Sequence, residues 1–291
     1  MTGVHVRPAS RSTAERRPVV VGVDGSDSAR HAADWAADVA AAWGVPLRLL
    51  HATPGPGPRE DGDPRWLREL CDAAERAGVE EVDRRIVTGP VADELIEQSR
   101  AAAMVVVGSY GEGARSGMLA GSTALALVDG GGCPVAVIRG TAPQVPPPRR
   151  GPVVVGMDTG GDVTALHTGA KLADALGARL CVLHAWSDVT EQGHGVHRST
   201  ASGTELAARA LELVDGRVAP LGEAYPGLAV ERHVVDDTAL RALLDHASTA
   251  RVVVVGHRRG RGAEGRLGST GRGLVGFAAC PVVVTRGAGR D

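Results

Sequence analysis

The sequence has very few aromatic residues, which make up only 2% of its 291 positions. Proteins that bind single-stranded nucleic acid stack bases on aromatic rings, and this composition offers little for such stacking. The net charge is −2 at neutral pH, so no basic surface for duplex phosphates is indicated. We therefore expect no nucleic-acid partner.

The chain also lacks long apolar runs and paired cysteines. No run approaches the roughly 18 apolar residues that span a membrane, so we expect no membrane contact. Residues 1–17 contain arginines but no apolar signal-peptide segment, and we expect a flexible tail. The four cysteines form no C-x-x-C pair. Cys133 and Cys280 occupy equivalent positions of the repeat, each just before a strand, and we expect both to be small buried residues. We expect free thiols in a reducing cytoplasm.

Recognisable catalytic and metal motifs are missing. No G-x-x-x-x-G-K-[ST] sequence occurs, which disfavours a P-loop ATPase. Gly260-x-Gly262-x-x-Gly265 fits a dinucleotide fingerprint formally, but it follows the fourth strand of its half and has no acidic residue about 20 positions on. His194 and His197 stand in a polar loop without further ligands, and no Ser–His–Asp set can be assembled. The sequence predicts no catalytic residue and no protein metal site.

An internal repeat is present instead. Val105–Ile138 and Val252–Thr285 each give an apolar strand, a glycine-rich loop, a Gly-Ser-Thr trio, a helix and a second strand. Upstream, VVVGVDGS from Val19 matches VVVGMDTG from Val153. Self-similarity on this scale indicates a tandem duplication.

Each half alternates five short apolar strands with helical segments. The predicted strands are 18–23, 47–51, 79–88, 104–107 and 134–139, then 153–157, 180–185, 228–235, 252–255 and 282–285. This alternation predicts two tandem Rossmann-like α/β domains, each a parallel sheet with helices on both faces. We place the domains at 18–140 and 151–287, joined by a proline-rich linker at 141–150. The segment 187–203, rich in Gly, His and Ser, is predicted to be a loop, and 204–221 a helix.

A ligand site is predicted where strands one and four end. Asp24 ends the first strand and Gly108 the fourth, and open α/β sheets bind ligands beyond the carboxyl ends of their strands. If these strands are neighbours, Asp24 can accept from a ribose or base while the loop N–H groups, with Ser122 and Thr123, hold phosphates. Considered on its own, without the surrounding motif, Asp24 is better explained as an aspartate that caps a turn or a helix. A structural role is preferred for His51 and His184.

The pattern as a whole identifies a family resemblance. Gly108-x2-Gly111-x9-Gly121-Ser122, downstream of VGVDGS and LLHA and closed by CPVAVI, resembles the ATP-binding universal stress proteins. The resemblance covers both halves. It implies a strand order of 3-2-1-4-5 in each half, an adenine-nucleotide ligand, and a regulatory or protective role in stress rather than rapid turnover.

The resemblance also implies roles for individual residues. In the first half, Gly22 and Asp24 would line the adenosine, the backbone of Ala52 would meet the adenine, Val107 and Gly108 would lie at the ribose, and Gly111, Gly121, Ser122 and Thr123 would hold phosphate. Mg²⁺ would accompany the triphosphate. The equivalents in the second half are Gly156, Asp158, Ala185, Val255, Gly256, Gly268, Ser269 and Thr270.

The second half departs from the family pattern. Gly256 and Gly268 are 12 positions apart, against 13 between Gly108 and Gly121, and Arg259 replaces the second glycine in a basic loop. Whether this half binds ATP stays open. Two other functions also stay open, a slow ATP hydrolase or nucleotidyl-transfer enzyme and an interaction scaffold that binds no nucleotide. Family members pair through strand five, so we expect 134–139 and 281–286 to pair within one chain as a pseudo-dimer, from which a homodimer could be built.

Overall fold

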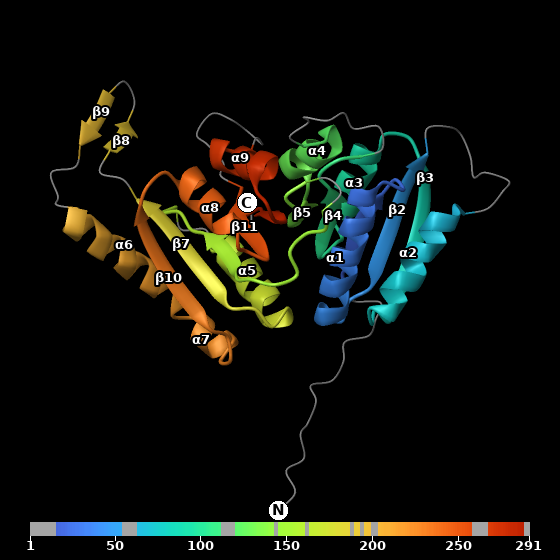
Figure 1. Cartoon of the computed structure of the whole chain (residues 1–291), viewed down its shortest axis with the longest axis horizontal. Coiled ribbons are helices and arrows are strands. Elements are labelled where there is room, and N and C mark those ends of the chain that lie inside the picture. Colours follow the sequence, from blue (N-terminus) through green and yellow to red (C-terminus); the bar gives the residue numbers. More distant parts are fainter. Residues whose placement is uncertain are drawn as a thin grey trace, which may run out of the picture.

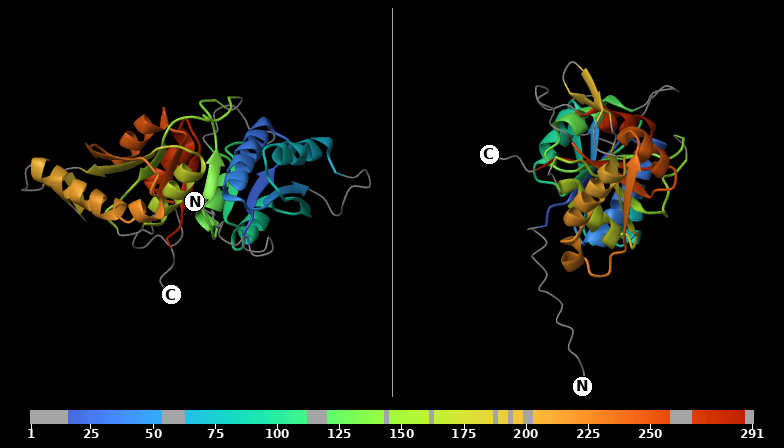
Figure 2. Two further views of the ribbon diagram at one scale, coloured as in Figure 1. Left: turned by 90° about the horizontal axis from the view of Figure 1, so that it is seen from below. Right: turned by 90° about the vertical axis from the view of Figure 1, so that its left-hand side faces the viewer.

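The structure is a computed structural model that describes residues 16–53, 63–111, 120–142, 145–160, 163–186, 189–192, 195–198, 203–257 and 267–287. Its main feature is one ten-stranded sheet, in the order β10-β7-β6-β11-β12-β5-β4-β1-β2-β3. The two halves lie end to end along the long axis of the molecule (Figures 1 and 2). Among the described residues, no helix has the length and apolar character that a membrane crossing requires.

The first half is a parallel sheet in the order that the resemblance implies. Its strands run β3-β2-β1-β4-β5, which is 3-2-1-4-5, so β1 lies between β2 and β4. The elements are β1 (Val19–Val23), α1 (Asp27–Trp43), β2 (Leu47–Thr53), α2 (Arg65–Arg76), β3 (Val82–Thr88), α3 (Val91–Ser99), β4 (Met104–Gly108), α4 (Ser122–Gly130) and β5 (Val135–Ile138).

The second half repeats this order as β10-β7-β6-β11-β12. Its elements are β6 (Val153–Gly156), α5 (Thr164–Ala175), β7 (Leu180–Trp186), β8 (Val189–Gln192), β9 (Gly195–Arg198), α6 (Gly203–Val218), α7 (Leu221–Ala224), β10 (Val230–Asp236), α8 (Ala239–Ala247), β11 (Val252–Gly256), α9 (Ser269–Phe277) and β12 (Val282–Thr285). The fold class predicted from the sequence is confirmed for both halves.

Two details of the sequence prediction were wrong. The predicted loop 187–203 contains β8 and β9, an antiparallel pair whose four-residue strands are too short to give a clear apolar alternation. The predicted single helix 204–221 is α6 followed by the short α7, with Pro220 as the N-cap of α7. Proline has no backbone N–H and cannot continue the hydrogen-bond ladder of α6, which explains the break.

The halves join through their fifth strands. β12 pairs antiparallel with β5, with Val282 opposite Val137, Val283 opposite Ala136 and Val284 opposite Val135. The predicted pairing within one chain is confirmed, and the result is one continuous mixed sheet (Figure 1). Because β5 is paired on both sides, a homodimer cannot use strand five and would need another surface. The outer strands β3 and β10 carry charged side chains, which discourage edge-to-edge association.

Side chains on both sides of the β5–β12 junction follow the pseudo-twofold symmetry of the repeat. Arg139 donates to the carbonyl oxygen of Val275 at 2.6 Å, and Arg286 donates to the carbonyl oxygen of the equivalent Val128 at 3.1 Å. The carboxylate of Asp129 also accepts from the N–H of Leu267 at 2.7 Å, and this bond has no symmetric counterpart among the described residues. The junction is therefore fixed by side chains as well as by the strand ladder.

The core forms one apolar layer on each face of the sheet. Helices α1, α2, α5 and α6 contribute to one layer, and α3, α4, α8 and α9 to the other, and each layer includes residues of both halves. The valines of the central strands are buried on both faces, as expected for parallel strands under two helix layers. All four cysteines are buried, free thiols. Burial raises the pKa of both Cys133 and Cys280 to about 12.

Candidate functional site

The structure brings Asp24 and the start of the glycine loop together at the carboxyl edge of the sheet. β1 pairs with β4, with Val21 opposite Val106, so the chain leaves both strands at the same edge. Gly111 lies directly over the aspartate, because a Cβ atom added there would stand 2.9 Å from Oδ2 of Asp24. The predicted neighbourhood of strands one and four is confirmed, and the loop starts against a carboxylate.

Asp24 also has the structural role that was given above as the alternative to ligand binding, because it stabilises the turn before α1. Its Oδ1 accepts from the N–H of Ser26 at 3.1 Å and from the hydroxyl of Ser26 at 2.6 Å. Ser26 is the N-cap of α1, and its hydroxyl accepts from the N–H of Ala29 at 3.1 Å. The two roles are compatible, since Oδ1 holds the turn while Oδ2 faces Gly111.

The end of β4 packs tightly on the first turn of α1. A Cβ atom added to Gly108 would overlap Oγ of Ser28 and stand 2.9 Å from the backbone carbonyl of Ser28. The same hydroxyl accepts from the N–H of Tyr110 at 3.3 Å. Ser28 is only 8% exposed. The sequence prediction did not include Ser28, although a small polar residue two positions after a helix cap was a usable signal.

The glycine loop closes onto the start of α4. The N–H of Gly121 donates to the carbonyl oxygen of Ser109 at 2.8 Å. The N–H of Ser109 in turn donates to the carbonyl oxygen of Ile138 at 2.9 Å. Gly121 is the N-cap of α4, and no described side chain caps this end. Backbone N–H groups at an uncapped helix start, including those of Ser122 and Thr123, are suited to an anion. Residues 112–119 of the loop lie outside the described part.

The remaining predicted residues of the first half lie along the same edge. A Cβ atom on Gly22 would stand 2.9 Å from Leu95 and 3.4 Å from Val107, so Gly22 also has a packing reason to be glycine. Ala52 is half-buried near the end of β2. Nδ1 of the preceding His51 lies 2.9 Å from the carbonyl oxygen of Val23 and ties β2 to the end of β1, so the structural role of this histidine is confirmed.

Comparison with known proteins gives the same assignment as the motifs. The sequence model of the universal stress protein family matches residues 15–139 and again residues 150–286. The chain belongs to the universal stress protein family. Its resemblance to this family, inferred from the motifs, is thereby confirmed for both halves.

Relatives of this universal stress protein include two proteins of Mycobacterium tuberculosis. Universal stress protein Rv2623 is 34% identical over 291 residues, and Rv2005c is 35% identical over 289 residues. Each alignment covers 92% of this chain and 96% of the relative. A solved universal stress protein from Archaeoglobus fulgidus superposes with a TM-score of 0.65 over 92% of this chain and 98% of its own, at 18% identity, and supports the fold alone.

The second half of this universal stress protein repeats part of the site. Gly156 packs as Gly22 does, since an added Cβ would stand 2.9 Å from Leu243 and 3.1 Å from Val255. Oδ1 of Asp158 accepts from the N–H of Gly160 at 2.8 Å, and Gly268 is the N-cap of α9 without a described side-chain cap. Ala185 lies near the end of β7, Ser269 and Thr270 open α9, and Nδ1 of His184 lies 2.8 Å from the carbonyl oxygen of Met157.

The second half differs around Gly256. A Cβ atom added to Gly256 would have no described atom within 4 Å, whereas a Cβ atom added to Gly108 would stand 2.9 Å from the backbone carbonyl of Ser28. One reason is the helix start, since α5 begins at Thr164, six residues after Asp158, while α1 begins three residues after Asp24. The basic loop with Arg259, the Gly260 fingerprint and His194 lie outside the described residues. The two sites are therefore not built alike.

Glycine substitutions test this difference. Gly108→Ala should destabilise the fold by about 1–3 kcal/mol, because the new methyl group overlaps the backbone of Ser28 and the two elements must separate. Gly256→Ala is the matched control, with open space around it, and should change stability by less than about 0.5 kcal/mol. Urea unfolding of both variants measures this, and equal effects would contradict the packing described for the first half.

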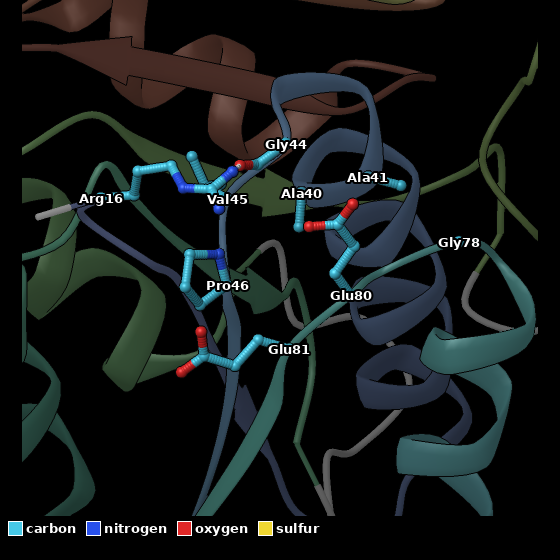
Figure 3. A pocket seen from close by; sticks show the side chains of 9 residues that line it. All are labelled: Arg16, Ala40, Ala41, Gly44, Val45, Pro46, Gly78, Glu80 and Glu81. Carbon is cyan, nitrogen blue, oxygen red and sulfur yellow. Dashed lines mark hydrogen bonds between the residues drawn. The ribbon is translucent and has the colours of Figure 1, made fainter. Parts of the chain in front are cut away.

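Two small cavities lie at opposite edges of the sheet in the first half. One of about 50 Å³ lies beside Gly108 and is lined by residues that include Ser28, His31, Tyr110 and Arg139, of which the sequence prediction included none. The other, also about 50 Å³, lies where β2 begins, at the amino ends of the strands (Figure 3). Its lining includes the carboxylates of Glu80 and Glu81 together with the guanidinium of Arg16. Only the first of these two cavities lies at the edge where α/β sheets bind ligands.

Proposed function

We propose that this universal stress protein binds ATP in its first half and serves as a nucleotide-responsive regulatory or protective protein. One observation carries the proposal, the position of Gly111 over Oδ2 of Asp24, beside the start of α4 that no described side chain caps. A glycine there leaves room that any Cβ would fill, and a ligand can approach the carboxylate and the backbone closely.

Each part of this edge suits one part of the nucleotide. Oδ2 of Asp24 would accept a hydrogen bond from the ribose or base, while Gly22 would line the adenosine and the backbone of Ala52 would meet the adenine. Val107 and Gly108 would border the ribose, and the N–H groups of Gly111, Gly121, Ser122 and Thr123 would hold phosphates. Mg²⁺ would bind mainly to phosphate oxygens, since it prefers oxygen ligands in octahedral geometry.

The equivalent residues of the second half are proposed to face a second ligand. Gly156, Asp158, Ala185, Val255, Gly256, Gly268, Ser269 and Thr270 lie at or near the carboxyl edge of that half. The different setting of Gly256 argues that the two affinities differ, so we count the sites separately below. Four buried free thiols support a reducing, cytoplasmic compartment for the protein.

Replacing Asp24 with asparagine tests the proposed site. The amide oxygen of asparagine still accepts from Ser26, so the turn and the thermal stability should be retained. The charge at Oδ2 is lost, and ATP affinity measured by titration calorimetry should fall about tenfold, the loss of roughly 1.4 kcal/mol. Asp158→Asn is measured in parallel, and a loss of ATP affinity in that variant would report on the proposed site of the second half.

Three results would change the assignment. Unchanged ATP affinity in Asp24→Asn would mean that Asp24 serves the turn alone. If the wild-type chain released phosphate from ATP in the presence of magnesium, and Asp24→Asn did not, the protein would be a slow ATP hydrolase. Absence of ATP binding in the wild-type chain would leave an interaction scaffold with this fold.

A further inference from the structure

Three metal-ligating side chains meet in the second half, away from the carboxyl edge. Cys181 of β7, His233 of β10 and His246 of α8 place one ligand atom each within 4.8 Å of one another. Cys181 is buried and the two histidines are half-buried. β10 pairs with β7, and α8 packs over β7 and its other neighbour β6 (Figure 1).

The rings are arranged as metal-binding histidines commonly are. Nδ1 of His246 lies 2.8 Å from the carbonyl oxygen of Ala242. A carbonyl can only accept, so in the neutral ring Nδ1 carries the proton and Nε2 carries the lone pair that a metal needs. The rings of His233 and His246 meet edge to face, with centroids 5.3 Å apart. Nε2 of His233 is 3.7 Å from Oε2 of Glu231, a carboxylate close to the cluster.

The first half fills the same place in the fold with a cation of its own. Arg48 donates to Oδ2 of Asp83 at 2.8 Å and to Oε1 of Gln98 at 3.0 Å. Arg48 is thus the centre of a polar network between β2, β3 and α3. The guanidinium supplies the positive charge in that network.

The repeat aligns this network with the cluster in the second half. Counted from the start of each element, the equivalents are Cys181 for Arg48, Glu231 for Asp83 and His246 for Gln98. The carboxylate is kept and the amide becomes an imidazole, but the arginine has become a thiol. Arg179 contacts the kept carboxylate, with its Nη1 3.4 Å from Oε1 of Glu231, so a metal ion would add a second cation beside the thiol and the imidazoles.

We propose that Cys181, His233 and His246 bind Zn²⁺ or a similar thiophilic divalent metal ion. Thiolate and imidazole are ligands that such ions prefer. Zinc distances of about 2.0–2.3 Å place tetrahedral ligand atoms about 3.3–3.8 Å apart, which small side-chain rotations would reach from the present spacing. Three protein ligands leave a fourth position for water, and Glu231 stands beside it as an outer group.

Metal binding at this cluster involves a proton. Burial, with a smaller contribution from Glu231, raises the pKa of Cys181 to about 11, and Arg179 opposes the shift. The thiol is therefore protonated at neutral pH in the metal-free protein. Zinc would displace this proton to solvent as the Zn–S bond forms.

The cluster is distinct from the proposed nucleotide site. Cys181 is the second residue of β7, and Ala185 lies four residues further along the strand, about 13 Å away at the usual rise. The metal would therefore bind at the amino ends of the strands, where it cannot accompany a triphosphate. The proposal does not depend on ATP binding.

Cobalt titration of the full chain tests the proposal. After the protein is treated with EDTA and desalted, Co²⁺ should bind at one ion per chain and give the near-ultraviolet absorption of a cobalt thiolate, which Zn²⁺ should abolish. Cys181→Ala should remove this absorption. Cys280→Ala is the matched control, since it deletes another buried thiol of the same half and should leave the absorption unchanged.

A second variant keeps the test valid if Cys181→Ala folds poorly. His246→Gln installs the residue that the first half has at this position, and it should lower the Co²⁺ affinity at least tenfold with an unchanged circular dichroism spectrum. Binding without thiolate absorption, absorption that survives Cys181→Ala, or the absence of stoichiometric uptake would overturn the proposal.

Discussion

Val283→Asp should unfold most of the second half. Val283 lies in the middle of β12, opposite Ala136 of β5, and its side chain is 0% exposed. A carboxylate there loses its hydration without a partner, or stays protonated at a comparable cost, and the loss should be about 4 kcal/mol or more. Natural domains have a net stability of only about 5–15 kcal/mol, so little would remain.

Thermal unfolding and hydrogen exchange measure this effect. Amides of β5 should lose protection together with those of β12, because the β5–β12 ladder is the only strand pairing between the described parts of the two halves. Ile86→Asp is the control, since Ile86 lies on the outer strand β3 and is 36% exposed. That variant should lose only about 1 kcal/mol. Similar stability of the two variants would contradict the continuous sheet.

Gly121→Val should abolish most ATP binding with little effect on stability. The backbone of Gly121 is extended, at φ −71° and ψ 153°, which valine adopts readily. An added Cβ meets only the carbonyl oxygen of Ser109, at an ordinary 3.5 Å. The valine side chain would nevertheless stand at the start of α4, where phosphate must approach the N–H groups. We expect at least a 100-fold loss of affinity, or about 2.7 kcal/mol.

Gly268→Val is the matched substitution in the second half, at the N-cap of α9. A further loss of stoichiometry in this variant would mean that the second half also binds ATP, and unchanged binding would restrict the ligand to the first half. Calorimetric titration of both variants separates these cases. Wild-type affinity in Gly121→Val would contradict the phosphate role of this edge.

The fold could be predicted from the sequence because its signals are local. Valine runs such as Val252–Val255 mark strands buried on both faces, and the glycine after each run marks where the chain leaves the sheet. The family resemblance also allowed the β5–β12 pairing to be inferred, since it implied pairing through strand five and the repeat supplies two such strands in one chain. The hairpin β8–β9 and the break at Pro220 were missed, because short strands and single prolines give weak patterns.

The candidate site was predictable only in part. Asp24 and Gly111 stood in a motif, whereas Ser28 became important only when the packing of α1 on β4 was seen. The metal cluster had no sequence signal, since Cys181, His233 and His246 come from three elements and match no ligand spacing. Such clusters depend on strand register and helix placement, which residue spacing alone does not provide.

The nucleotide content of the purified protein is the most direct test of ATP binding. The wild-type protein would be purified gently and denatured, and the released nucleotide would be counted per chain by chromatography. We expect about one ATP released per chain, or two if the second half also binds ATP. A protein that carries no nucleotide, and binds none when ATP is titrated back with Mg²⁺, would contradict the account.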